Sequence, residues 1–251
     1  MIEEPENHLC FSSMNKMLHE IINRQPESQI LIATHSNMIA SRLNLANVQW
    51  ITENEVISLK NVNKNIAAFF EKSDNNNFLQ LLLSKKIILV EGVSEYLLLP
   101  KIYQQVMKRT VEDDKITIIS CNGISYNNYL EIVKDADKRI AVITDNDKKL
   151  KKVTEAEEFN KKNEKHHIFT DNCVENDWTW EASFYNLNKI ILGTLIKVEK
   201  SANYLFHDVD YGQILGKMLN NKADTAYQML ISKETFVIPQ YVEDAIIWLN
   251  K

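Results

Sequence analysis

Two short apolar runs that end abruptly in acidic residues constrain the fold of this chain more than any other feature. The first is IILVEGVSE, from Ile87 to Glu95, and the second is IAVITDND, from Ile140 to Asp147. Branched apolar runs of this length are typical of strands buried on both faces of a parallel sheet. Functional side chains in such sheets collect where the strands end, at the carboxyl edge. The two runs therefore predict a sheet that brings several carboxylates together.

Strand-like and helix-like segments alternate along the middle of the chain. We expect strands at residues 86–90, 116–120, 139–144 and 166–170, with helices over 94–108 and 126–136 between them. This alternation predicts an α/β fold in which helices flank a parallel sheet. The remainder, residues 179–251, has mostly helical patterns and ends in a helix over 242–249 after Pro239.

The first third of the chain has its own pattern. We expect a helix over 14–22, a short buried strand over 29–33 that leads into Thr34, His35 and Ser36, and a helix over 38–43. A hairpin over 48–51 and 55–59 follows, and then a helical connector over 65–83 that is interrupted near the DNNN sequence at 74–77.

Charge and hydropathy exclude some classes of protein. No apolar run approaches the roughly 20 residues that span a bilayer, and the N-terminal MIEEPENH is acidic where a signal peptide would be basic. We therefore expect a cytoplasmic protein without membrane contact. The net charge of −5 argues against a wholly basic nucleic-acid binder. It is compatible with an enzyme whose carboxylates bind metal ions, because a bound cation reverses the local field.

Two pairs of acidic residues carry the expected chemistry. Glu91 and Glu95 lie four residues apart where a strand turns at Gly92 into a helix, so one helical turn brings them to the same face. Asp145 and Asp147 alternate at the end of another strand, so both can face one point. Converging carboxylates suit Mg²⁺ or Mn²⁺ and would repel one another without a cation. Each pair alone could be a solvated helix start or a turn.

Several motifs resemble one known family. LVEG at 89–92 and ITDND at 143–147 resemble the acidic motifs of a Toprim (topoisomerase-primase) domain. IEEPENHL at 2–9 is similar to the Walker B and D-loop region of an ABC-type ATPase, and LIATHS at 31–36 resembles its switch-histidine strand. An ABC-type ATPase end followed by Toprim is the arrangement of the OLD (overcoming lysogenization defect) family of ATP-dependent endonucleases. The resemblance covers essentially the whole chain.

The resemblance assigns roles to individual residues. It makes Glu91, Glu95, Asp145 and Asp147 ligands of divalent metal, two Mg²⁺ or Mn²⁺ ions per site. TWEASFY at 179–185 resembles a later acidic motif of the family and makes Glu181 a further ligand, with Glu175 in VENDW as the alternative. NNKADTAYQML at 220–230 resembles the stretch with the family's catalytic lysine, which suggests Lys222. A solvated lysine at a helix start is the competing interpretation of that residue.

The ATPase motifs are incomplete in this chain. The resemblance makes Glu3 the magnesium-side acid, Glu4 the catalytic glutamate and His35 the γ-phosphate sensor, yet no phosphate-binding loop and no glycine-rich ABC signature occur. We therefore expect a fragment of a longer protein, one that needs its missing N-terminal ATPase portion to bind ATP. The predicted organisation is an ATPase remnant over 1–62, a helical connector over 63–84, and a Toprim domain with a helical C-terminal extension over 85–251.

A lysine-rich stretch follows the second acidic motif directly. Its basic residues are Lys148, Lys149, Lys151, Lys152, Lys161, Lys162, Lys165, His166 and His167. We expect mainly a solvated, partly disordered insertion, and as a function the binding of the DNA backbone beside the metals.

The function implied by the family is metal-dependent cleavage of DNA with two ions, gated by ATP. A catalytically silent binding or dimerisation module and a Toprim enzyme that acts on RNA remain alternatives. A homodimer and a role in defence against phage follow from the resemblance alone.

Overall fold

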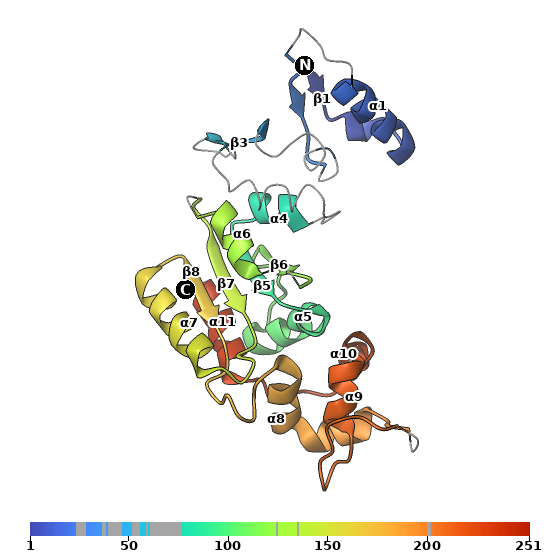
Figure 1. Cartoon of the computed structure of the whole chain (residues 1–251), viewed down its shortest axis with the longest axis vertical. Coiled ribbons are helices and arrows are strands. Elements are labelled where there is room, and N and C mark those ends of the chain that lie inside the picture. Colours follow the sequence, from blue (N-terminus) through green and yellow to red (C-terminus); the bar gives the residue numbers. More distant parts are fainter. Residues whose placement is uncertain are drawn as a thin grey trace. The chain divides into compact units, whose positions relative to one another are not determined.

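The computed structural model describes residues 1–23, 29–36, 39, 47–51, 56–58, 60, 77–123, 125–134, 136–199 and 202–251. The chain forms two compact units (Figure 1). Unit 1 comprises residues 1–83 with 128–136, and unit 2 comprises residues 84–127 with 137–251. Within the described residues, no helix combines the length and the apolar character that crossing a membrane requires.

Unit 2 is built on a four-stranded parallel sheet. The strands lie in the order β6 (Ile116–Ser120), β5 (Lys86–Val90), β7 (Arg139–Ile143) and β8 (His166–Phe169). Val90 pairs with Ser120 on one side and with Ile143 on the other, so the three strands end at the same level. The residues that follow β5 and β7 therefore begin side by side. The four predicted strands and their parallel arrangement are confirmed.

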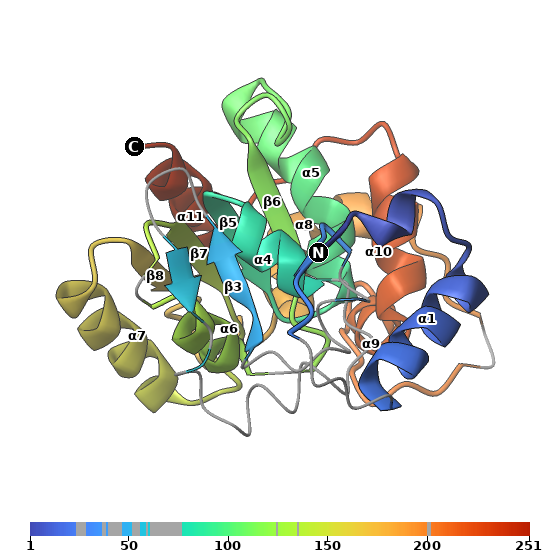
Figure 2. The ribbon, with the colours of Figure 1, turned by 90° about the horizontal axis from the view of Figure 1, so that it is seen from above.

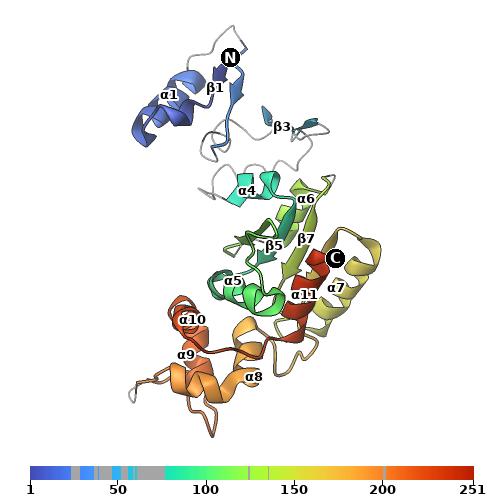
Figure 3. The same cartoon turned by 180° about the vertical axis from the view of Figure 1, so that it is seen from behind.

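Helices cover the sheet of unit 2. They are α5 (Val93–Met107), α7 (Leu150–Lys162), α8 (Trp180–Leu195), α9 (Ile214–Asn220), α10 (Lys222–Ile231) and α11 (Gln240–Asn250). α11 packs on β7 and β8, α5 on β6, and α10 along α5. Helices α8, α9 and α10 gather beyond the carboxyl ends of the strands (Figures 1 and 3), and α7 lies on the opposite side of unit 2 from α9 and α10 (Figure 2).

Burial of the central strand on both faces fixes this sheet. Ile87, Ile88, Leu89 and Val90 are each 0% exposed, which explains why β5 reads as a continuous apolar run. Full burial of each such side chain contributes roughly 1.5–3 kcal/mol. The helices at the carboxyl edge belong to the same core through Trp180, Phe184, Met218 and Met229. The helices beyond the carboxyl edge therefore share one hydrophobic core with the sheet, and this packing fixes the edge that carries the acidic residues.

One prediction in unit 2 is wrong. The lysine-rich segment 148–165, expected as a partly disordered insertion, forms helix α7. Leu150, Val153 and Ala156 recur at helical spacing among the lysines, and Val153 and Ala156 are buried while Leu150 stays exposed. Two small apolar anchors, with half-buried Phe159 and Asn160, thus order a helix whose charged side chains mostly face water. The helix expected over 126–136 is shorter, because α6 covers only Tyr126–Ile132.

Unit 1 contains short elements. β1 (Ile2–Glu3) pairs in parallel with β2 (Ile32–Ala33), and β3 (Gln49–Ile51) forms a hairpin with β4 (Val56–Ser58). The remaining elements are the 3₁₀ turn η1 (Pro5–Asn7) and the helices α1 (Phe11–Asn23) and α4 (Asn77–Leu83). The predicted first helix and hairpin are confirmed. The helix expected over 38–43 and most of the connector lie outside the described residues.

Candidate functional site

The two acidic motifs meet at the carboxyl edge of the sheet in unit 2. Glu91 directly follows β5, and Thr144 and Asp145 follow the neighbouring strand β7. The Thr144 hydroxyl, itself buried, donates a hydrogen bond to the Glu91 carboxylate. Because the two strands end in register, this bond joins the two motifs at the first residue after each strand.

Glu95 lies in the first turn of α5 and is 3% exposed. Among the described residues, its Oε2 atom has no hydrogen-bond partner. The same atom would lie 3.1 Å from a Cβ at Gly92. Gly92 has an extended backbone (φ −136°), so it makes room for the Glu95 carboxylate rather than the left-handed corner that a glycine often marks.

Burial and neighbouring carboxylates raise the pKa of two acids at this edge, Glu95 and Asp145. Loss of water contact raises the pKa of Glu95 to about 7, the charges of Glu181 and Glu91 add to the rise, and Lys222 opposes it. Burial likewise raises the pKa of Asp145 to about 8, with contributions from Glu95, Glu91 and Glu181. The backbone N–H of Trp180 donates to Asp145 Oδ1 at 2.8 Å and partly offsets this rise. Negative charge at this edge is therefore incompletely compensated.

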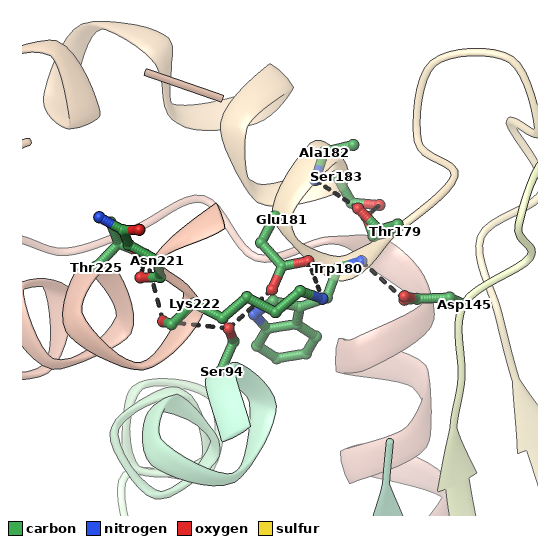
Figure 4. Close-up of polar contacts among 10 residues, drawn as sticks. All are labelled: Ser94, Asp145, Thr179, Trp180, Glu181, Ala182, Ser183, Asn221, Lys222 and Thr225. Atoms are coloured by element: carbon green, nitrogen blue, oxygen red, sulfur yellow. Dashed lines mark hydrogen bonds and ion pairs between the residues drawn. The ribbon is translucent and has the colours of Figure 1, made fainter. Parts of the chain in front are cut away.

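Glu181 approaches the same edge from the start of α8. Thr179 caps this helix by accepting a hydrogen bond from the Ala182 N–H at 3.2 Å, which fixes the first turn. Glu181 is 1% exposed and accepts hydrogen bonds from Ser94 Oγ at 2.8 Å and from Lys222 Nζ at 3.1 Å (Figure 4). The Lys222 side chain reaches it from the first residue of α10. Burial lowers the pKa of Lys222, but the charge of Glu181, its hydrogen bond and the charges of Asp145 and Glu95 together outweigh burial and raise this pKa.

The two aspartates of the DND loop have different surroundings. Asn146 between them is buried and donates to the carbonyls of Asp171 and Asp177 at 3.0 and 2.9 Å. The backbone is left-handed at Asp147 (φ 51°), so the alternation expected for an extended chain does not continue. Asp147 is 48% exposed and forms an ion pair with Lys152 at 2.7 Å. Asp145, in contrast, faces the buried glutamates.

The structure thus brings together Glu91, Glu95, Asp145, Glu181 and Lys222, and places Asp147 at their exposed side with Lys152. Glu175, the alternative to Glu181, is exposed and lines a separate pocket. Gly123 has a positive φ of 79° with open space around it. It lies in the turn after β6.

Sequence reasoning missed three side chains that hold these acids. Ser94 and Thr144 each donate a hydroxyl to a glutamate, and Lys152 bridges the Asp145 carbonyl and the Asp147 carboxylate at 3.0 and 2.7 Å. Ser94 and Thr144 lie inside the acidic motifs, and Lys152 was noted only as one of many lysines. The available signal was that Ser94 and Thr144 stand directly before Glu95 and Asp145 in the sequence, although each hydroxyl bonds a different, distant glutamate.

The donors of this cluster suit a hard cation, although the acids are not gathered tightly around one point. Among the described residues, no three Asp, Glu, His or Cys side chains are close enough to hold a metal ion. The unpartnered Oε2 of buried Glu95 and the raised pKa values of Glu95 and Asp145 nevertheless show an unmet need for positive charge. Oxygen-only ligands of this kind fit Mg²⁺ or Mn²⁺. Lys222 and Lys152 supply the positive charge at Glu181 and Asp147.

The residues singled out in unit 1 lie in a more exposed setting. Glu3 ends the two-residue strand β1 and is exposed. Glu4, also left-handed at φ 41°, lies 3.6 Å from His35 Nε2. Glu6, which the sequence did not suggest, accepts hydrogen bonds from Thr34 Oγ1 at 2.7 Å and from the His35 N–H at 2.8 Å. The histidine loop is therefore tied to Glu6.

Comparisons with known proteins agree with the motifs. Residues 82–147 match the family model described as the TOPRIM domain of overcoming-lysogenization-defect-like proteins. The chain is 26% identical over 133 residues to the Old nuclease of Escherichia phage P2, a match that covers 49% of this chain and 23% of that protein. This chain thus matches only about a quarter of its curated relative's length.

A solved structure is also similar. The C-terminal region of the Burkholderia pseudomallei OLD protein aligns with a TM-score of 0.48 and 16% identity, over 66% of this chain and 97% of that one. The family match spans β5, β6 and β7 and both acidic motifs, from before Glu91 to Asp147. Residues 82–147 are therefore similar to the TOPRIM domain of OLD-like proteins, as the motifs of the chain predict.

Proposed function

We propose that this chain is a metal-dependent DNA endonuclease that hydrolyses phosphodiester bonds at the carboxyl edge of the β5–β7 pair. The match to the Old nuclease and the TOPRIM family model support the reaction class. The charge-coupled cluster of Glu91, Glu95, Asp145 and Glu181 supports the position of the site. DNA as the substrate, rather than RNA, follows from the family resemblance.

The carboxylates would divide between two divalent ions. Glu91, Asp145 and Asp147 would hold one ion, and Glu95 and Glu181 the other. When bound, Mg²⁺ or Mn²⁺ supplies an activated water and stabilises the leaving oxygen. Ser94 and Thr144 orient Glu181 and Glu91 for this role through their hydroxyl groups.

Lys222 has two partners in this proposal. In the structure its ammonium group pairs with Glu181 at 3.1 Å and is 41% exposed on its side chain. A cation at Glu181 would compete with this pair and leave the ammonium group free to donate to a phosphate oxygen. Lys222 is the first residue of α10 and lies beside Ser94, so its side chain can reach either Glu181 or the phosphate. Its proposed role is to stabilise negative charge on the phosphate.

The observation that carries the proposal is the meeting of acids where β5 and β7 end in register. Thr144 donates to Glu91 there, and buried Glu95 has an Oε2 atom without a hydrogen-bond partner among the described residues. A plasmid-nicking assay with Mg²⁺ or Mn²⁺ tests the proposal. Wild-type protein converts supercoiled plasmid to open circles, and Asp145→Asn lowers the rate at least hundredfold, because a ligand and a charge are lost together. Glu112→Gln, an exposed glutamate outside the cluster, is the matched control. Full activity of Asp145→Asn would exclude this site.

A specific observation favours a second candidate, a binding or dimerisation module that is silent on its own. Lys222 and Lys152 already pair with Glu181 and Asp147, as expected for a closed resting site. Such a module would bind Mg²⁺ without nicking DNA. In that case ATP and an ATPase portion around Glu3, Glu4 and His35 would be needed to open the site. The protein would then act as a homodimer in defence against phage.

A further inference from the structure

A pocket of about 260 Å³ lies beside the DND loop. Its lining includes two aromatic rings in contact, Trp178 and Phe206, with ring centroids 5.5 Å apart and planes inclined by 36°. Both rings are partly exposed. The Lys148 ammonium lies 4.8 Å from the centre of the Trp178 ring and also lines the pocket. The pocket therefore combines aromatic surface with a positive charge.

The backbone links this pocket to the candidate site. The N–H of Asp147 donates to the carbonyl of Trp178 at 3.1 Å, and the N–H of Trp180 donates to Asp145 Oδ1 at 2.8 Å. Segment 178–180 is thus bonded to both aspartates, and Glu181 follows it directly. A ligand on Trp178 would lie near three of the proposed metal ligands, because Glu181 is three residues along the chain and these hydrogen bonds join Asp145 and Asp147 to the segment.

An unusual turn places Lys148 over Trp178. Asp147 and Lys148 both have a left-handed backbone, with φ of 51° and 61°. This conformation costs roughly 1–3 kcal/mol for each residue that is not glycine. Asn146 stabilises the turn, because its Oδ1 accepts the Lys148 N–H at 2.9 Å while its amide is held on the other side. This strained turn places the Lys148 ammonium group over the Trp178 ring.

The acidic residues of the pocket do not prevent binding of a phosphate-bearing ligand. Asp208 accepts hydrogen bonds from Tyr185 at 2.7 Å and from Lys189 at 2.9 Å, and these contacts hold its pKa well below the usual range. Its charge is thus paired with a lysine. Glu175 is exposed at the edge of the pocket. Lys148 remains the charged group that lies over the Trp178 ring.

We propose that the Trp178–Phe206 pocket takes an unpaired base of the DNA strand that is bound at the acidic cluster. Aromatic rings beside a lysine are the usual receptor for a single-stranded nucleotide, since the base stacks and the phosphate pairs with the cation. Lys148 covers Trp178 in the free protein by a cation–π contact. On binding, its ammonium group moves to the phosphate and the base replaces it on the ring.

The inference rests on the proposed nuclease function and makes its substrate more specific. Strands with an unpaired nucleotide beside the cleaved bond are preferred over continuous duplex. Stacking on one ring corresponds to a change of about 5- to 100-fold in affinity. The pocket contributes this factor independently of metal ions.

The test measures binding of labelled oligonucleotides by fluorescence anisotropy without divalent metal. Single-stranded DNA is compared with a strand of equal length and charge that carries abasic sites. Wild-type protein binds the strand with bases about tenfold more tightly. Trp178→Ala removes the difference, and Trp178→Phe, which keeps a ring, retains most of it. Phe206→Leu is a second variant should Trp178→Ala fail to fold, as judged by thermal unfolding.

A matched variant separates the charge from the ring. Lys148→Gly preserves the left-handed backbone, so it weakens binding of both strands equally and reduces the salt dependence by about one phosphate contact. Equal wild-type affinity for the two strands, or an equal loss on both in Trp178→Ala, overturns the inference. If the protein nicks plasmid but binds the two strands equally, this inference alone is contradicted. If it prefers the strand with bases but does not nick plasmid, the proposed nuclease function is contradicted and the inference about the pocket is supported.

Discussion

Each unit of the molecule contains a strand that ends in acidic residues beside a parallel neighbour. In unit 1 both strands have two residues, and Glu4 and His35 form a pair with side chains 48% and 74% exposed. In unit 2 the strands have four or five residues and are covered by helices, and Glu95 and Glu181 are 3% and 1% exposed. The same sequence signal thus leads to two different environments.

The difference shows that coverage of the strands, and not the acidic motif, decides the chemistry. Water screens the Glu4–His35 pair, so the interaction between its partners is weak. In unit 2, loss of water and mutual repulsion raise the pKa of Glu95 to about 7 and that of Asp145 to about 8. Glu6 in unit 1 differs from the acids of unit 2. Burial raises its pKa, but hydrogen bonds from Thr34 and backbone amides together outweigh burial and lower the pKa below its usual value.

The largest expected effect comes from neutralising the buried acid without a hydrogen-bond partner. Glu95→Gln keeps the size of the side chain and removes its charge, so we expect nicking to fall at least hundredfold while the melting temperature at pH 8 rises by about 3 °C. Nicking rates and thermal unfolding of the same preparation measure both. A fall in stability would show that the Glu95 charge is well compensated, against the contrast drawn above.

The next effect concerns the ion pair at Glu181. Lys222→Met leaves a carboxylate that is 1% exposed without its cation, and we expect a loss of about 2 kcal/mol in the free energy of unfolding. The double variant Lys222→Met with Glu181→Gln should recover most of that loss. Chemical denaturation compares the three proteins. Additive losses in the double variant would mean that the two side chains are not coupled.

The smallest effect belongs to unit 1. Glu4→Gln removes the exposed pair with His35, and we expect a change of less than about 1 kcal/mol in stability, which high salt abolishes. Thermal unfolding at low and high salt measures it. A loss as large as that of Lys222→Met would remove the contrast between the two units.

The sheet could be predicted from the sequence almost to the residue, because a strand buried on both faces is written as an uninterrupted apolar run. β5 and β6 match their expected bounds, and β7 and β8 match theirs within one residue. Helix α7 was missed since lysines mask its apolar positions, of which Val153 and Ala156 alone are buried in the described helix. A charge run reports solvent exposure and does not report disorder.

The candidate site was predictable only in part. Glu91, Glu95 and Asp145 follow from the strand ends, and Glu181 and Lys222 came from the family resemblance. The Lys222–Glu181 pair joins residues 41 positions apart, so no local pattern reveals it. Lys152 pairs with Asp147 because the turn there is left-handed, a property that neither residue type announces. The roles of all these residues as ligands stay predictions.

The central claim is that the buried acids form a divalent cation site, and the pH dependence of the melting temperature with and without Mg²⁺ tests it most directly. Asp145 and Glu95 have folded-state pKa values of about 8 and about 7, above the ordinary values of 3.8 and 4.5 for these side chains. The folded state therefore binds more protons, and the stability that these groups contribute below pH 4 is lost as the pH rises through 7 and 8.

Without divalent metal we expect the melting temperature to fall by roughly 5 °C between pH 6 and pH 8.5, and Mg²⁺ to restore it at pH 8.5 because the ion binds the deprotonated acids. The double variant Asp145→Asn with Glu95→Gln should show neither the fall nor the rescue. An equal response to Mg²⁺ in wild type and double variant, or a wild-type melting temperature that does not change over this range, would contradict the account.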